Sequence, residues 1–234
     1  MKTILFLTNV TRQIAMMREA MNDLQQKRLI SDACQCIWID ENTVWSSKWP
    51  DILHDMDFVL IKWMGSGLDT PFLNKCAAYL QQHKLPHYVD TAGGAADGFS
   101  DILSGGQILQ LKKYFSYGGR QNISHLWLYI DNCLEHSSSA VPEPEMLPWC
   151  GIFHPDADKI YTDLNEYCHD FCHTGIPTIG ILFYRAEWIW NDLAYQTALV
   201  KEIEQQHMNA VCVFSNGLPD ETMGAPNLKH VFNS

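Results

Sequence analysis

The sequence predicts an α/β protein: an open, mostly parallel sheet of the flavodoxin or Rossmann type, followed by the start of a second α/β unit. Three observations support this fold class. Short apolar runs alternate with segments of helix length, and the runs are apolar throughout, as expected for strands that are buried on both faces. A stretch rich in Ser and Pro interrupts the pattern past the middle of the chain, and the pattern then resumes.

Four apolar runs in the first part of the chain are predicted to form parallel strands. The first run is a strand and not a secretory signal, because Thr8 and Asn9 interrupt it and no small-residue cleavage site follows. Segments of helix length separate the runs, as in βαβ units. The predicted strands lie near Ile4 to Thr8, Cys36 to Ile39, Phe58 to Trp63 and Tyr88 to Thr91.

Helices are predicted between these strands and after them. Residues 12–26 and 70–82 form the first two, and the earlier one carries apolar residues at spacings of three and four, which places them on one face against the sheet. Gly118 and Gly119 separate two further helical patterns and mark a helix C-terminus, and Asn122 or Ser124 is expected to cap the helix that follows. The apolar face of the first helix consists of Ile14, Met17, Ala20, Met21 and Leu24.

The Ser- and Pro-rich stretch divides the chain into two predicted domains. Residues 1–135 form the N-terminal α/β domain, residues 136–155 form a linker, and residues 156–234 begin a second α/β unit. Because two strands and one helix leave a parallel sheet incompletely covered, we expect this unit to continue beyond residue 234. Its predicted elements are helix 156–173, strand 177–184, helix 191–207 and strand 209–215.

Composition excludes several classes of partner. The chain has 47% hydrophobic and 18% charged residues, which is sufficient for a core, and its formal charge of -11 opposes binding to nucleic acid or to anionic membranes. No window approaches the roughly 20 apolar residues that cross a bilayer, so we expect a cytoplasmic protein. The eight cysteines are scattered along the chain, which fits reduced thiols packed as small hydrophobic groups.

Two motifs suggest ligand chemistry but do not satisfy its requirements. The glycine-rich loop Thr91 to Gly98 matches no phosphate-binding pattern and is followed by no suitable Lys. The segment Cys168 to His173, CHDFCH, has helical spacing of two thiols and two imidazoles, and Cys150 or His154 is a conceivable further ligand. Because a structural zinc site needs four ligands and no second cluster matches, we predict that this segment holds no metal.

Eight Trp residues are many for a chain of this length. Most are expected in the core, where Trp is heavily buried on average. Four lie at predicted strand ends or in the linker, where the alternative is stacking on a flat ligand. These four are Trp63, Trp149, Trp188 and Trp190.

Three segments in the second half of the chain resemble a known family. They are Trp149 to Pro155, Pro177 to Arg185 and Val211 to Ser215, which read WCGIFHP, PTIGILFYR and VCVFS. Their order and spacing resemble the N-terminal region of the CobN-type large chelatase subunit, a family that includes the cobaltochelatase subunit and the H subunit of magnesium chelatase. The segment Tyr114 to Ile130, with its paired glycines, fits the same pattern.

The resemblance implies a function for the chain. It would be the N-terminal portion of the tetrapyrrole-binding subunit of an ATP-dependent cobaltochelatase, which inserts cobalt into a corrin-type ring in cobalamin biosynthesis. The implied partners are the tetrapyrrole, separate AAA+ ATPase subunits and the remainder of the large subunit. The family's chelation chemistry belongs to regions that this chain lacks, so no catalytic residue is carried over and no cofactor is expected on the chain itself.

Other interpretations remain open. One is a non-catalytic docking or tetrapyrrole-binding module of a related magnesium chelatase or haem-handling homologue, and another is an unrelated flavodoxin-like domain that would copurify with yellow flavin. The candidate ligand-binding residues are Trp149, His154, Arg185 and Trp188, because Arg185 follows a buried strand at the end where α/β sheets collect ligands. The alternative is that Arg185 pairs with a local acid and Trp188 covers apolar surface. If these residues bind ligand, Arg185→Ala should leave the stability of the chain nearly unchanged.

Overall fold

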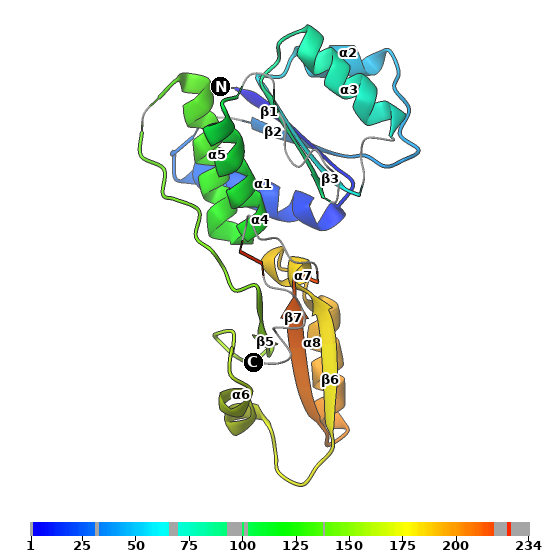
Figure 1. Ribbon diagram of the computed structural model, residues 1–234, viewed down its shortest axis with the longest axis vertical. Helices are drawn as coiled ribbons and strands as arrows, with labels where there is room; N and C mark the ends of the chain where they lie inside the picture. Colours follow the sequence, from blue (N-terminus) through cyan, green and yellow to red (C-terminus); the bar gives the residue numbers. More distant parts are fainter. Residues whose placement is uncertain are drawn as a thin grey trace. The chain divides into compact units, whose positions relative to one another are not determined.

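The computed structural model describes residues 2–30, 33–65, 70–92, 100, 103–137, 139–217 and 224–225. The chain divides into two compact units, Met1–Glu145 and Met146–Ser234, and the division falls inside the predicted linker. Each unit has its own sheet (Figure 1). Within the described ranges, no helix combines the length and the apolar character needed to cross a membrane.

The first unit contains a sheet of parallel strands, as the sequence predicted. Their spatial order is β2-β1-β3-β4, so the direction in which the chain adds strands reverses between β1 and β3. Neighbouring strands pair over most of their length and all pairs are parallel. The strands are β1 (Thr3–Thr8), β2 (Ala33–Trp38), β3 (Phe58–Met64) and β4 (His87–Ala92).

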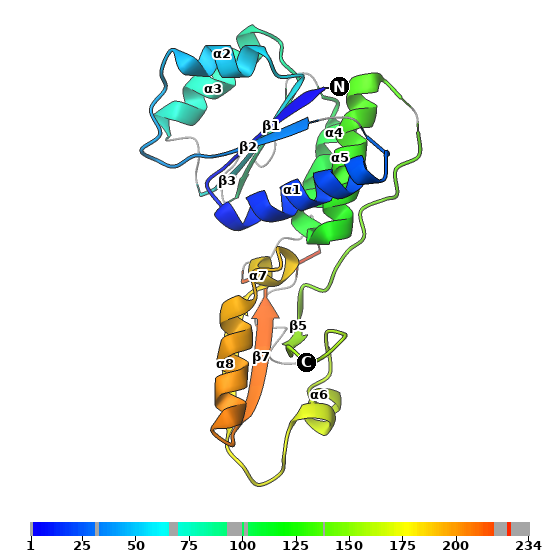
Figure 2. The same cartoon turned by 180° about the vertical axis from the view of Figure 1, so that it is seen from behind.

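Helices cover both faces of this sheet (Figures 1 and 2). On one face Phe115 of α4 lies 6.3 Å from Phe6 and 6.4 Å from Tyr88, measured between ring centroids. Nε1 of Trp127 donates to the carbonyl of Met17 at 3.0 Å and joins α5 to α1. The opposite face packs on α2 and α3. These helices are α1 (Thr11–Gln26), α2 (Lys48–His54), α3 (Pro71–Gln82), α4 (Gly105–Tyr117) and α5 (Gly119–Glu135).

Local sequence signals define the boundaries of α4 and α5. Ser104 and Gln107 form a capping box at the start of α4. Gly118 has φ of 65° and ends α4, as its glycine predicted. The predicted cap of α5 was wrong: Gly118 is the N-cap residue, Asn122 Nδ2 donates to the Gly118 carbonyl at 2.8 Å, and Ser124 donates to the carbonyl of Arg120.

The first half of the Ser- and Pro-rich segment is tied to the first unit. The hydroxyl of Tyr114 donates to the carbonyl of Pro142 at 2.6 Å. Asn122 accepts from the backbone N–H of Glu145 at 2.9 Å and donates to its carbonyl at 2.8 Å. These bonds satisfy backbone groups of a segment that has no regular secondary structure, and they place residues up to 145 with the first unit.

The second unit contains a sheet of order β5-β7-β6. Strands β6 (Thr178–Tyr184) and β7 (Asn209–Ser215) are parallel and are connected through α7 (Arg185–Ile189) and α8 (Ala194–Gln205), which confirms the predicted β-α-β unit. The sequence analysis missed β5 (Cys150–Phe153), which is antiparallel to β7. It lies within the predicted linker, and a four-residue strand next to Pro148 gives no periodic signal.

The predicted helix 156–173 was wrong over its first half. Only α6 (Leu164–Phe171) is helical, and Asp163 caps it by accepting from the backbone N–H of Glu166 at 2.8 Å. Upstream, Tyr161 exchanges backbone hydrogen bonds with Ile152 of β5, at 2.8 and 3.1 Å. A residue whose N–H and carbonyl are paired with a strand cannot also continue a helix.

Gly151 is required where this segment crosses β5. A Cβ atom at this position would lie 2.3 Å from Cγ2 of Ile160 and 3.1 Å from the ring of Phe214. The absence of a side chain at Gly151 therefore permits the close approach between β5 and the segment that covers it.

Candidate functional site

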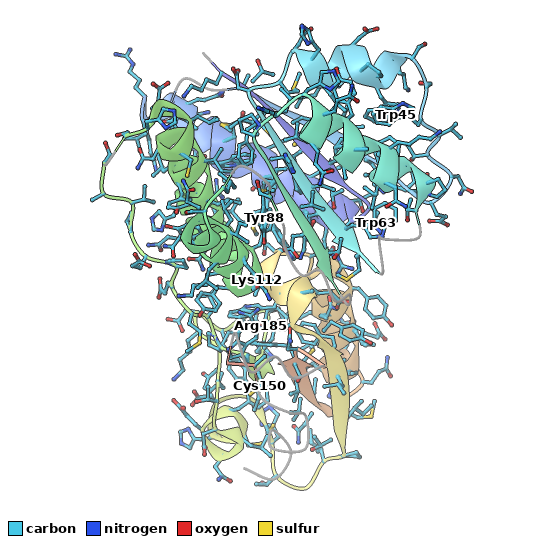
Figure 3. All side chains as sticks on the ribbon, turned by 45° about the horizontal axis from the view of Figure 1, so that its top comes forward. Trp45, Trp63, Tyr88, Lys112, Cys150 and Arg185 are labelled. Carbon is cyan, nitrogen blue, oxygen red and sulfur yellow. The ribbon has the colours of Figure 1, made fainter. Side chains whose placement is uncertain are left out.

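Three of the four candidate ligand-binding residues lie at the same end of the second sheet. Tyr184, Ser215 and Cys150 are aligned across β6, β7 and β5. Arg185 directly follows β6 and Trp149 directly precedes β5, so both lie at the carboxyl end of the parallel strands, and Figure 3 labels Arg185 and Cys150 there. This is the end of an α/β sheet at which ligands bind.

Arg185 is buried, with 1% of its surface exposed. Its Nε donates to the carbonyl of Pro148 at 2.7 Å and its Nη2 to that of Leu147 at 3.2 Å. The guanidinium lies 4.2 Å from the ring centre of Trp149, within cation-π distance. Burial lowers the pKa of Arg185 to about 10, so the group is still protonated at neutral pH. Arg185 therefore fastens the segment 147–149 to the end of β6.

The burial of Arg185 changes the expected effect of its substitution. A buried cation with backbone partners contributes to stability, because its removal leaves carbonyls without donors. The expectation that Arg185→Ala leaves stability unchanged therefore does not fit the structure.

Trp188 packs against the core of the second unit. Its ring lies 4.4 Å from that of Phe214 with an interplanar angle of 17°. This arrangement favours the alternative in which Trp188 covers apolar surface. Trp63 and Trp190, the other candidates for stacking, are buried in the two units.

The sequence analysis missed Tyr184, the last residue of β6. Its side chain is 67% exposed at the same end of the sheet. A Cβ atom at Gly217 would lie 3.3 Å from its ring, and Gly217 has φ of 78°, so the backbone after β7 passes close to this aromatic surface. The sequence signal that could have identified Tyr184 is an aromatic residue at the carboxyl end of a predicted strand.

His154 lies apart from the other three candidates and is 2% exposed. It follows β5, on the side of the sheet that leads away from Trp149. Its ring stacks on Phe171 at 3.8 Å. Its Nδ1 accepts from the backbone N–H of Asp156 at 3.2 Å, so its Nε2 carries the proton and donates to Glu204 at 2.8 Å.

His154, Asp156 and Glu204 have ligand atoms within 4.8 Å of one another. A metal ion on Nε2 would require the proton on Nδ1, which faces the N–H of Asp156. The ammonium group of Lys201 also pairs with Asp156 and lies 3.8 Å from Glu204, and it lowers the pKa of Asp156 by hydrogen bonding. Both contacts favour an ion-pair network over a metal site at this cluster.

The thiols of the CHDFCH segment lie at the end of α6 and just beyond it. Burial raises the pKa of Cys172 to about 11, so its thiol is protonated at neutral pH. Metal ligation requires the thiolate. The expected absence of metal from this segment stays a prediction.

The carboxyl end of the first sheet has a different chemistry. Asn9 bridges β1 and β3 where the strand order reverses: its Nδ2 donates to the carbonyl of Met64 at 2.9 Å and its Oδ1 accepts from the same residue's N–H at 2.8 Å. Lys62 and the buried Asp90 form a partly buried ion pair at 2.6 Å. Residues 93–98 of the glycine-rich loop lie outside the described residues. In a flavodoxin-like fold the ligand binds in the crevice where the strand order reverses. In this sheet the side chain of Asn9 connects the two strands at that position by hydrogen bonds.

The fold places the chain in the class of α/β proteins. Its first sheet is parallel and covered by helices on both faces, and its second unit has the exposed Tyr184 at the carboxyl end of the parallel strands. The profile of the CobN/Magnesium Chelatase family matches residues 112–234. The match covers more than half of the chain and includes all of the second unit, and the chain belongs to this family.

Similar proteins are much longer than the chain. An uncharacterized protein of Methanocaldococcus jannaschii is 32% identical over 113 residues, which are 47% of this chain and 9% of the relative. The structure of the catalytic subunit of cobaltochelatase from Mycobacterium tuberculosis is similar with a TM-score of 0.53 and 17% identity, over 92% of this chain and 16% of that one. At this identity the structural likeness shows the fold.

Proposed function

We propose that this chain is the N-terminal portion of the large tetrapyrrole-binding subunit of an ATP-dependent cobaltochelatase. The supporting observation is the family match across residues 112–234, which contains the segments Trp149 to Pro155 and Pro177 to Arg185. Cobalt and the corrin-type ring would be substrates, and AAA+ subunits in the cytoplasm would supply energy from ATP. Chelation itself is assigned to no residue of this chain.

The contribution proposed for the chain is a surface at the carboxyl end of β6. Tyr184 offers an exposed aromatic face, and the buried guanidinium of Arg185 holds Trp149 at the same end of the sheet. Aromatic faces stack favourably on flat conjugated ligands. Arg185 and Trp188 act in this proposal as positioning residues, whereas His154 lies in the ion-pair network elsewhere in the unit.

Absorption titration of the purified chain tests this proposal. A metal-free corrin-type ring and protoporphyrin are each added, and a shift of the main absorption band reports binding. Tyr184→Ser should weaken binding of the corrin-type ring, while Tyr195→Ser, which changes a 72% exposed tyrosine on α8, should not. If both variants bound the corrin-type ring with equal affinity, Tyr184 would not belong to the proposed binding surface. Tighter binding of protoporphyrin than of the corrin-type ring would favour the magnesium or haem-handling alternative.

A second candidate function is docking of another part of the large subunit. Leu182 and Tyr184 of β6 are 57% and 67% exposed, and this strand has a pairing partner only on its β7 side among the described residues. Uncharged, exposed edge strands readily pair with a further strand. Two results together would favour docking. The purified chain would show no absorption shift with tetrapyrrole, and cobalt insertion by the reassembled subunits would be lost on Leu182→Lys.

A further inference from the structure

A cavity of about 340 Å³ lies in the second unit at the amino ends of β6 and β7. Phe171 and Met208 contribute apolar walls, and His173, Glu204 and His207 contribute polar groups. This is the end of the sheet opposite to Trp149 and Arg185. Its volume lies in the range of small-ligand sites, roughly 300–1,000 Å³.

The fold brings His173 to this cavity through Asn209, the first residue of β7. Asn209 accepts from the backbone N–H of His173 at 2.8 Å and donates to its carbonyl at 3.0 Å. This double hydrogen bond fixes the turn after α6 beside the end of α8. His173 is therefore held beside Asn209, which lies two residues along the chain from His207.

His207 and Glu204 lie one helical turn apart at the C-terminal end of α8. The backbone N–H of His207 donates to the carbonyl of Glu204 at 3.0 Å, and His207 has φ of 57°, a left-handed conformation that directs the chain from the helix into β7. The C-terminal end of a helix carries a partial negative charge and favours cations. Within the described residues, no hydrogen bond involves the exposed ring of either His173 or His207.

We propose that this cavity binds one divalent transition metal ion through the imidazoles of His173 and His207 and the carboxylate of Glu204. Imidazole and carboxylate together suit zinc, cobalt or nickel and not magnesium or calcium. One oxygen of Glu204 accepts from His154, and the other has only a 3.8 Å contact with Lys201, so it is the oxygen that reaches the ion. In the structure the ligand atoms of these three residues do not all lie within 4.8 Å of one another, so the two exposed imidazoles must rotate to reach the ion.

The ligand set combines groups that are distant in the sequence. The proposal departs from the expectation that the CHDFCH segment, which includes His173, holds no metal. The segment by itself has too few ligands, but the fold adds two groups from α8 and the turn after it. The proposal does not depend on the chelatase function.

Cobalt(II) binding to the tag-free, chelator-treated chain tests the site by equilibrium dialysis and visible absorption. We expect one ion per chain, with ligand-field bands and without a thiolate charge-transfer band. The double variant His173→Ala/His207→Gly should weaken binding by at least about tenfold, since even outer-shell changes produce effects of that size. Glycine is chosen at position 207 because it accepts the positive φ.

His169→Ala is the matched control, because His169 lies on α6 beside Asp170 and is 87% exposed but does not line the cavity. It should bind cobalt like the unaltered chain. Three outcomes would overturn the proposal: no stoichiometric binding, equal binding by the double variant, or a charge-transfer band that disappears in Cys172→Ser. A melting temperature measured without metal shows whether the variants remain folded.

Discussion

Strands β3 and β6 have the same length and similar apolar sequences, FVLIKWM and TIGILFY, yet their environments differ. In β3, which lies between β1 and β4 with helices on both faces, Leu60 is fully buried. In β6, at the edge of its sheet, Leu182 is 57% exposed. An apolar run therefore predicts a strand in both units, but the number of neighbouring elements decides how much that run contributes to stability.

The largest expected difference comes from truncating one leucine in each strand. Leu60→Ala removes fully buried methyl groups and should lower the free energy of unfolding by about 2–5 kcal/mol. Leu182→Ala should change it by less than about 0.5 kcal/mol, as for other surface positions. Urea denaturation of both variants measures the difference. Similar losses would show that β6 is covered in solution.

A smaller contrast lies within the second sheet. Gly151→Ala places a methyl group against Ile160 and should destabilise the second unit by about 1–3 kcal/mol, as overpacking does. Gly180→Ala on β6 meets no atom within 4 Å and serves as the control. Thermal unfolding that showed no difference between the two variants would mean that the segment over β5 moves away without cost.

Arg185→Lys tests whether the guanidinium fastens the segment before β5. Lysine cannot reproduce both carbonyl hydrogen bonds at once in the fork geometry, so we expect a loss of about 1 kcal/mol. Arg120→Lys is the control in the first unit, because Arg120 is exposed and pairs with Asp23. If Arg185→Lys lost no more stability than Arg120→Lys, the guanidinium of Arg185 would have no structural role.

The smallest effect concerns the ion pair of Asp156 with Lys201. The pKa of Asp156 in the folded chain is lowered, so its contribution to stability is present above its unfolded pKa, about 3.9, and is lost as the pH falls through the lower folded value. Asp156→Asn should therefore be slightly less stable at pH 7 and equally stable at pH 2. Because the pair is exposed, a large difference at pH 7 would indicate a stronger network around Glu204.

The sequence by itself determined the fold class and most of the elements. Buried parallel strands such as β3 are apolar on both faces, and helix α1 shows its 3.6-residue period, so local patterns suffice for them. The break at Gly118 was also readable, because a positive φ favours glycine. The segments that resemble the family were visible for the same reason: they are contiguous in the chain.

Only the tertiary structure decided which residues meet. It placed β5 inside the expected linker, because strand formation there depends on pairing with β7, which is distant in sequence. It buried Arg185 against carbonyls of residues 147 and 148 and separated His154 from the other candidates. It also brought His173 to the end of α8 through Asn209. Such contacts leave no local pattern, because they arise from packing between segments far apart in the chain.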